Sequence, residues 1–318
     1  MRIFVAGGTG VVGRRAVPAL VAHGHEVTVV ARSPEKAALV RELGATPVEV
    51  NLFDGEAIKA AVAGHDVVVN LATSIPPSSK AARKSAWSMN DRIRREGSRN
   101  LVDAALAAGA SRYVQESIAF LYADAGEAWI AEDHPVKATS ITASSLDAEA
   151  EARRFESSAG TAVILRFGSF YGADSGHTAD VLRFARRGFG TTPGPRDAYL
   201  SSINTDDAAS AVVAAATEAP SGIYNVVDDD PVTREELDRI LARAVGREKL
   251  HAAPNVLVRL MGDKLDHVVR SQRVSNQALR TATRWEPRWP SVREGIPAVA
   301  VAMSTSPTAP RERSDSSA

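Results

Sequence analysis

Three glycines close to the N-terminus have the spacing of a phosphate-binding turn. They lie in the run Gly7-Gly8-Thr9-Gly10-Val11-Val12-Gly13, between an apolar stretch (3–6) and an amphipathic stretch (14–22). Gly7 would permit the tight turn, Gly10 the close approach of a pyrophosphate, and Gly13 the packing of a helix against the strand. Free N–H groups at the start of that helix would bind the phosphates. We therefore expect a dinucleotide to contact Gly7, Thr9, Gly10, Val11, Val12 and Gly13; the alternative is a turn with no ligand.

The end of the next apolar run indicates which dinucleotide. A protein that binds NAD usually has an acid there to hold the ribose 2′-hydroxyl. This chain has Ala31-Arg32, and Arg32 lies 19 residues after Gly13. A guanidinium forks onto phosphate, so we expect NADP rather than NAD. The alternative is that Arg32 is a solvated loop charge. No Gly-Lys-Ser or Gly-Lys-Thr closes the loop, which argues against a phosphate-loop NTPase.

Strands that alternate with helices would position this turn. Short apolar runs predict strands, and amphipathic stretches between them predict helices. The predicted strands after the first two are 46–50, 67–72, 112–117, 162–167 and 222–227, and the predicted helices include 55–63, about 81–108, 145–157 and 208–218. This alternation predicts an α/β fold, a Rossmann-like doubly wound parallel sheet. Ligands bind at the carboxyl edge of such sheets.

Composition excludes several classes of function. The chain has 318 residues, a net charge of +0 and no cysteine. The charge balance argues against a nucleic-acid partner, and the missing cysteine excludes disulfides and thiol catalysis. The histidines show no paired metal spacing, so we expect no metal site. We expect a cytoplasmic protein with a small-molecule substrate, because neither a signal peptide nor an apolar run of membrane-spanning length is present.

From about residue 1 to 300, the chain resembles the extended short-chain dehydrogenase/reductase family, the NAD-dependent epimerase/dehydratase group. The resemblance rests on the glycine run together with Asn70-Leu71-Ala72, Leu165-Arg166-Phe167, Tyr171-Gly172, Asp206-Asp207-Ala208 and Tyr224-Asn225-Val226. It implies a dinucleotide domain (1–168 plus about 196–228) and a small C-terminal substrate domain (about 169–195 and 229–300). Residues 303–318, rich in Ser, Thr, Pro and Arg, would be a disordered tail.

The resemblance also implies cofactor contacts beyond the glycine turn. Asn51 stands where the family usually has an acid that binds the adenine amino group, and its carboxamide oxygen can accept the same hydrogen bond. Leu52 follows it directly. The other implied contacts line the dinucleotide after the fourth strand: Leu71, Ala72 and Thr73. The family's habit of dimerising makes a homodimer a possible assembly.

The family's catalytic pair is missing. Its chemistry uses Tyr-x-x-x-Lys, with a serine or threonine nearby. The residues four places after the five tyrosines (113, 122, 171, 199 and 224) are Ser117, Gly126, Ser175, Ile203 and Asp228, and none is lysine. Counted back from Glu151, the two positions become Ala143 and Asp147. The family's serine position becomes Ile118, and its helix asparagine becomes Arg94.

Three residues are candidates to replace the lost catalytic groups. Ser117 ends the fifth strand, Tyr122 follows it, and Arg94 would project toward the same cleft. Their structural alternatives are a strand end, a packed aromatic ring and a solvated helix charge. Glu116 should face the opposite side of the strand from Ser117. His134 and His177 are weaker acid–base candidates, and the polar run 270–276 would hold a substrate or cover the domain surface.

Two main hypotheses follow. The first is an NADP-dependent oxidoreductase or epimerase that acts on a small carbonyl or hydroxyl compound without the usual Tyr-x-x-x-Lys pair. The second is a non-catalytic NADPH-binding sensor or regulator. A third, an isomerase that uses the dinucleotide structurally, stays open, because a fold by itself does not decide function.

Overall fold

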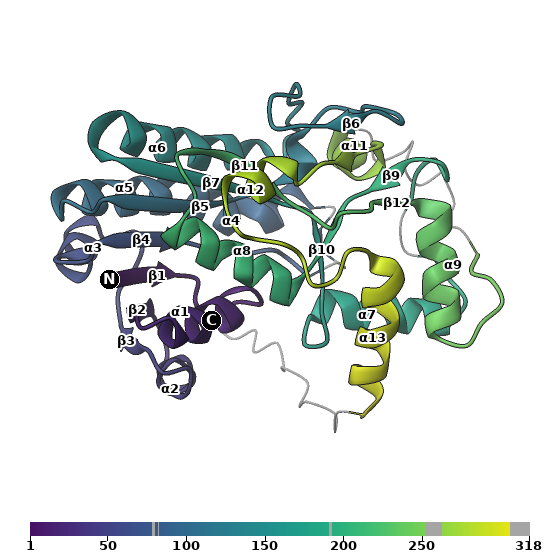
Figure 1. Ribbon diagram of the computed structural model, residues 1–318, viewed down its shortest axis with the longest axis horizontal. Helices are drawn as coiled ribbons and strands as arrows, with labels where there is room; N and C mark the ends of the chain where they lie inside the picture. Colours follow the sequence, from purple (N-terminus) through teal and green to yellow (C-terminus); the bar gives the residue numbers. More distant parts are fainter. Residues whose placement is uncertain (78–79, 82, 191–192, 252–262, 306–318) are drawn as a thin grey trace.

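A seven-stranded parallel sheet forms the centre of the molecule (Figure 1). The computed structural model describes residues 1–77, 80–81, 83–190, 193–251 and 263–305. From one edge to the other, the strands are β11 (Gly222–Val226), β7 (Thr161–Phe167), β5 (Arg112–Ile118), β4 (Val67–Asn70), β1 (Arg2–Ala6), β2 (Glu26–Val30) and β3 (Thr46–Val48). The order reverses beside β1, which places the glycine turn between β1 and β4. The predicted fold class is confirmed.

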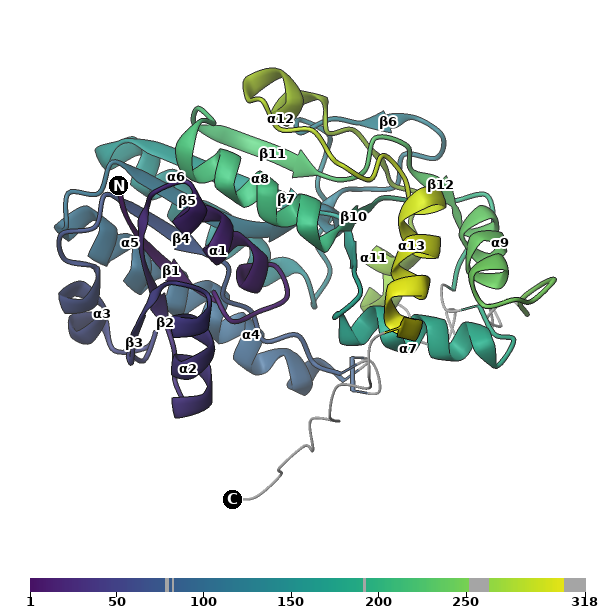
Figure 2. The same cartoon turned by 60° about the horizontal axis from the view of Figure 1, so that its bottom comes forward.

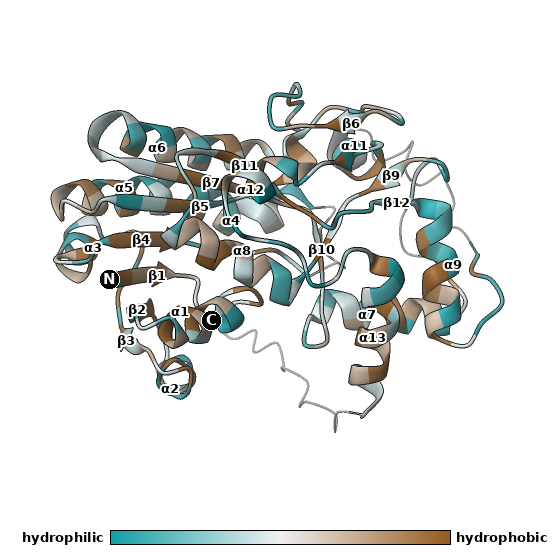
Figure 3. Cartoon of the chain, viewed as in Figure 1, coloured by the Kyte–Doolittle hydropathy of each residue, from teal (hydrophilic) through white to brown (hydrophobic). Residues whose placement is uncertain are grey.

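Helices cover both faces of the sheet (Figures 1 and 2). Successive side chains of β1 enter opposite cores: Val5 packs on the side of α1 and α8, and Phe4 on the side of α3, α5 and α6. The strands are therefore apolar on both faces, as their colours in Figure 3 show. The helices of these two layers are α1 (Gly13–Ala22), α2 (Pro34–Glu42), α3 (Gly55–Val62), α5 (Ser98–Ala107), α6 (Ala143–Ala159) and α8 (Thr205–Thr217). No helix in the described ranges is long and apolar enough to cross a membrane.

The segment after β4 is not the single helix expected over 81–108. It begins at Lys84 with a 3-10 turn (η1, Lys84–Trp87) and continues as α4 (Ser88–Arg92), a π-helical turn (η2, Ile93–Gly97) and α5. A π turn holds one more residue than an α turn, so it rotates the side chains that follow. Arg94 lies in this turn and is buried. Periodicity read at 3.6 residues per turn does not anticipate that rotation.

A second apolar core lies beside the sheet and is built from α7 (Gly176–Arg186), α9 (Arg234–Ala244) and α13 (Val292–Thr305). Figure 1 shows these helices grouped to the right of the sheet. The short elements of this half are β8 (Ser169–Tyr171), β9 (Tyr199–Leu200), β10 (Ser202–Asn204), β12 (Val232–Thr233), α11 (Asp263–Val269), β13 (Arg273–Val274) and α12 (Gln277–Ala282), and β13 pairs with β6 (Trp129–Ile130). The division into two domains stays a prediction.

The start of the expected disordered tail needs a correction. Helix α13 continues to Thr305, so Met303–Thr305 are helical. Part of the Met303 side chain packs against the second core, which extends the helix beyond the point where the composition changes. Residues 306–318 lie outside the described residues.

The glycine turn yields a stability prediction. A methyl group at position 13 would lie 2.4 Å from the Gly7 carbonyl oxygen and 2.6 Å from Gly8 Cα, both backbone atoms that cannot rotate away. Gly13→Ala should therefore destabilise the fold by about 1–3 kcal/mol, measured as a lower midpoint of urea unfolding. Gly176→Ala is the control, because its methyl would meet nothing within 4 Å. Equal midpoints for the two variants would show that the turn is not close-packed.

Candidate active site

The glycine turn leaves backbone donors without partners at the start of α1. Gly7 has φ +84°, and a methyl there would lie 2.4 Å from the Leu71 carbonyl carbon. A methyl at Gly10 would meet only the Gly7 oxygen, at 3.2 Å, so the chain is open on that side. Within the described ranges, the N–H groups of Val11 and Val12 donate no hydrogen bond. Unpaired N–H groups at a helix N-terminus suit a pyrophosphate.

The turn rests on the segment after β4. The Asn70 side chain fixes that segment: its Oδ1 accepts a hydrogen bond from Ala72 N at 3.1 Å, while its Nδ2 donates to Ser98 Oγ at 3.1 Å. Leu71, Ala72 and Thr73 therefore lie beside Gly7, on the open edge of the sheet. The predicted cofactor residues from β1 and β4 are thus brought together.

Arg32 and Asn51 lie together at the ends of β2 and β3. They line a pocket of about 330 Å³ together with Glu49, Val50 and Phe53. Arg32 is exposed and forms no ion pair within the described part of the chain. The Asn51 Oδ1 atom accepts a hydrogen bond from Phe53 N at 3.1 Å, and its second lone pair remains for a ligand. Leu52 differs from them, because its side chain is buried in the core.

Ser117 belongs to a buried ion-pair network. Its hydroxyl donates to Glu149 Oε1 at 2.7 Å, and Arg166 binds both oxygens of the same carboxylate, each at 2.8 Å. Burial lowers the pKa of the Arg166 guanidinium, but the hydrogen bond and charge of Glu149 outweigh it, so the net shift is upward. Ser117 itself is fully buried. Its hydroxyl is thus engaged inside the protein.

Arg94 is buried and is not a solvated helix charge. Its Nη2 donates to both oxygens of Glu116, at 2.9 and 3.1 Å, and its Nη1 donates to Ser145 Oγ. Its side chain is 2% exposed. Ser145 lies one turn before Glu149 on α6, so the contacts of Arg94 and of Ser117 both reach this helix. That Glu116 and Ser117 face opposite sides of β5 stays a prediction. The carboxylate of Glu116 compensates the charge of Arg94 in this arrangement.

Tyr122 is also buried and paired. Its hydroxyl donates to Asn225 Oδ1 at 2.7 Å, and the Arg166 guanidinium lies 4.9 Å from its ring centre. Burial raises its pKa to about 12, although the charge of Arg166 acts in the opposite direction. The hydroxyl therefore keeps its proton at neutral pH. The structure links Tyr122 to Ser117 through Arg166 and Glu149, whereas Arg94 is paired with Glu116.

The buried glutamate of α6 is Glu149 rather than Glu151. Glu151 lies nearer the surface and pairs with Arg154 at 2.7 Å. Counting from Glu149 moves the two catalytic positions of the family from Ala143 and Asp147 to Ile141 and Ser145, which are both buried. Neither register contains a tyrosine or a lysine. In both registers the family's Tyr-x-x-x-Lys pair is therefore missing at these positions.

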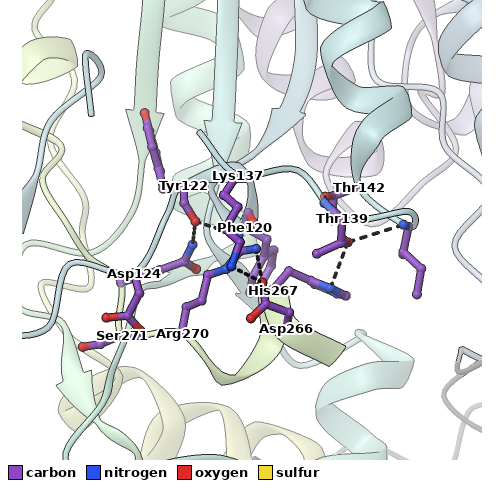
Figure 4. A network of polar contacts seen from close by, with 12 residues as sticks. Phe120, Tyr122, Asp124, Lys137, Thr139, Thr142, Asp266, His267, Arg270 and Ser271 are labelled. Atoms are coloured by element: carbon purple, nitrogen blue, oxygen red, sulfur yellow. Dashed lines mark hydrogen bonds and ion pairs between the residues drawn. The ribbon is translucent and has the colours of Figure 1, made fainter. Parts of the chain in front are cut away.

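The polar run from residue 270 clamps the loop after β5 (Figure 4). Arg270 Nη1 donates to the Tyr122 carbonyl oxygen at 2.9 Å, and Gln272 Nε2 donates to the same oxygen at 2.8 Å. Both side chains are buried. Arg270 and Gln272 therefore join the loop after β5 to the C-terminal half of the chain. The sequence had suggested that this run holds a substrate or covers the domain surface.

Sequence reasoning missed one titratable side chain near the sheet edge. His267 Nδ1 lies 3.3 Å from Thr139 Oγ1, and the His267 ring meets Phe120 edge-on (Figure 4). No motif surrounds His267, and 128 residues separate it from Thr139. Only tertiary structure brings them together. Of the expected histidines, His134 packs against the Tyr122 ring, and His177 lies in the first turn of α7.

The Glu149 network yields a second stability prediction. Glu149→Gln keeps the shape of the side chain but leaves the Arg166 guanidinium buried without its counter-charge. Loss of one partner of a buried pair costs about 3–5 kcal/mol, so the midpoint of urea unfolding should fall sharply. Glu56→Gln is the control, because Glu56 is 87% exposed and its ion pair among the described residues is with Lys59, across the surface of α3. A Glu149→Gln protein as stable as this control would refute the network.

Comparisons with known proteins agree with this geometry. A family model described as NAD(P)H-binding matches residues 7–219. The chain is 34% identical over 312 residues to a 3-diazoavenalumate denitrifying reductase from Streptomyces sp., covering 93% of this chain and 99% of that protein. It is 30% identical over 264 residues to a 4-hydroxy-2-methyl-3-oxo-4-farnesyl-3,4-dihydroquinoline-1-oxide ketoreductase from Stigmatella aurantiaca, covering 77% and 74% of the two chains.

Among solved structures, the chain resembles human epimerase family protein SDR39U1 (isoform2) with NADPH. The TM-score is 0.79 at 22% identity, over 95% of this chain and 99% of that one. At this identity the likeness concerns the fold, whereas the family model and the two reductases extend the match to sequence. The chain belongs to the NAD(P)H-binding, extended short-chain dehydrogenase/reductase family.

Proposed function

We propose that this protein is an NADP-dependent reductase that transfers hydride from NADPH to a polar multiple bond of a small molecule. A ketone and a diazo group are the two acceptor classes that we favour. One observation supports the proposal: the glycine turn leaves N–H groups available at the start of α1, whereas counting back from Glu149 puts Ile141 and Ser145 at the positions of the family's proton-transferring pair. The protein would therefore bind the hydride donor NADPH but lack the tyrosine that transfers the proton in the family.

The missing base favours reduction over oxidation or epimerisation. Oxidation of an alcohol requires removal of the hydroxyl proton as hydride leaves, and an epimerase must do this in every cycle. Reduction of a ketone needs a proton donor rather than a base, and hydride addition to a diazonium ion needs neither, so reduction makes a smaller demand on the missing pair. We infer that Ser117, Tyr122 and Arg94 support the walls of the site through their buried bonds. Each of these three side chains is already bonded to a protein group, so none is placed to exchange a proton with a substrate.

The preference for NADP rests on Arg32. Its guanidinium lies at the end of β2, beside Asn51, and forms no ion pair within the described ranges, with Glu49 lining the same pocket. A ribose 2′-phosphate would supply a counter-charge and could be bound by two parallel hydrogen bonds. The 2′-hydroxyl of NAD offers no charge to the same group.

The names of two relatives support the choice of reaction. Both are reductases: one is named for a ketone reduction and the other for the denitrification of a diazo compound. Hydride addition to the terminal nitrogen of a diazonium ion gives a neutral diazene, which can lose N₂. That reaction needs no acid at the tyrosine position. A non-catalytic NADPH sensor is the competing function, and it would bind NADPH without consuming it.

The cofactor preference is tested by titration with NADPH and NADH, followed by nucleotide fluorescence. Arg32→Ala should weaken NADPH binding about 10- to 100-fold, because a charge-assisted hydrogen bond contributes about 1.5–3 kcal/mol. Binding of NADH should change little. Arg41→Ala removes an exposed arginine of α2 and is the matched control. Equal losses for both nucleotides would contradict the assignment of Arg32 to the 2′-phosphate.

The reaction class is tested with three probes, by following NADPH absorbance for two hydride acceptors and by chromatography of the sugar nucleotide for UDP-glucose. We expect enzyme-dependent oxidation with 9,10-phenanthrenequinone or a benzenediazonium salt, after subtraction of the reaction without protein. We expect no isomerisation of UDP-glucose. Saturable NADPH binding with no turnover of any probe would instead support the sensor, and isomerisation would support the epimerase.

A further inference from the structure

His267 is held between two segments that end at the ligand-binding edge of the sheet. Phe120 follows β5 by two residues, and Thr139 precedes α6 by four residues. His267 Nδ1 is 3.3 Å from Thr139 Oγ1, and the ring centres of His267 and Phe120 are 6.4 Å apart at 85°. The carboxyl ends of parallel strands share one edge, so His267 lies on the same edge of the sheet as the Leu71–Thr73 segment after β4.

A clamp fixes the helix that carries this histidine. Arg270, directly after α11, donates to the Tyr122 carbonyl oxygen at 2.9 Å and pairs with Asp266 at 2.5 Å. Lys137, from the loop before α6, reaches the same Asp266 carboxylate at 3.3 Å (Figure 4). Helix α11 is thus attached to both the loop after β5 and the loop before α6. These contacts hold α11 against the two loops.

Charged groups near α11 already have polar partners. Asp266, on the same helix as His267, is shared by Arg270 and Lys137, and Asp124 accepts a hydrogen bond from Ser271 N at 2.7 Å. Two of the contacts of the imidazole, Thr139 and Phe120, are uncharged. They come from the loop before α6 and the loop after β5, whereas the charges of Asp266, Arg270 and Lys137 lie on or beside α11.

We propose that His267 donates the proton that completes reduction of a ketone in this site. The step rests on the proposed reductase function. Hydride leaves NADPH for the carbonyl carbon, and the π electron pair moves to the carbonyl oxygen. The imidazolium of His267 gives its proton to that oxygen, which leaves NADP⁺, an alcohol and a neutral imidazole. Water then returns the proton. Imidazole is suited to this role because it gains and loses its proton near neutral pH.

Kinetics test the proposal with His267→Gln and 9,10-phenanthrenequinone as the acceptor. Loss of a general acid typically lowers kcat about 10²- to 10⁴-fold, while the dissociation constant for NADPH should stay within a factor of two or so of the wild type. The wild-type rate should fall as pH rises through the near-neutral range, and the variant should lose that dependence. His251→Gln, which alters an exposed histidine beside Phe189, is the control. A fully active His267→Gln protein overturns the proposal.

A second measurement, NMR of the histidine side chains, tests the position of His267 without requiring a substrate to be turned over. Protein labelled with [13Cε1]histidine contains seven histidines, and the signal missing from His267→Gln identifies His267. That signal should shift on saturation with NADP⁺ and shift again with NADPH, because the nicotinamide changes charge nearby, whereas His251 should not respond. A His267 signal that ignores both nucleotides overturns the proposal. If the signal responds but no acceptor is reduced, the reductase function fails while the location of His267 at the cofactor edge stands.

Discussion

Direct contact between two backbone segments is the constraint on which the rest of the structure depends. The turn after β1 lies so close to the segment after β4 that a single methyl group at Gly7 would overlap Leu71. That contact needs β1 and β4 as neighbours in the sheet, and the strand order provides this. It also aligns the first turn of α1 with the open edge. The unpaired N–H groups of Val11 and Val12 follow from the same close approach.

Two buried ion pairs lie beside the carboxyl end of β5, next to the proposed reaction site. Glu149 pairs with Arg166, and Glu116 pairs with Arg94. Such pairs are costly to break, so they fix side chains more than they add to stability. Ser117 and Tyr122 are drawn into the first pair, and this explains why the obvious replacements for the lost tyrosine are poor proton carriers. The proton in our account comes instead from α11.

Local patterns predicted the parts of the site that are contiguous in sequence. The glycine turn, Arg32 and the apolar strands are visible because turn chemistry and strand burial act over a few residues. The burial of Arg94 was not visible, since a π turn shifts the helix face without a clear sequence signal. The choice between Glu149 and Glu151 also needed the fold, because only the position of Arg166 distinguishes them. His267 lies far from its partners along the chain.

Hydride transfer is the central claim, and isotope tracing tests it most directly. The protein would be given NADPH carrying deuterium at C4 of the nicotinamide together with 9,10-phenanthrenequinone, and the products would be analysed by mass spectrometry and NMR. The reduced quinone loses its carbon-bound label on rearomatising, and the N–D of a diazene exchanges with water, so an aryl ketone is used in parallel to retain the label. Our account predicts deuterium on the carbinol carbon of the alcohol formed from the aryl ketone, and one NADP⁺ formed per product. An alcohol without deuterium, or NADPH that is bound and never consumed, would contradict it.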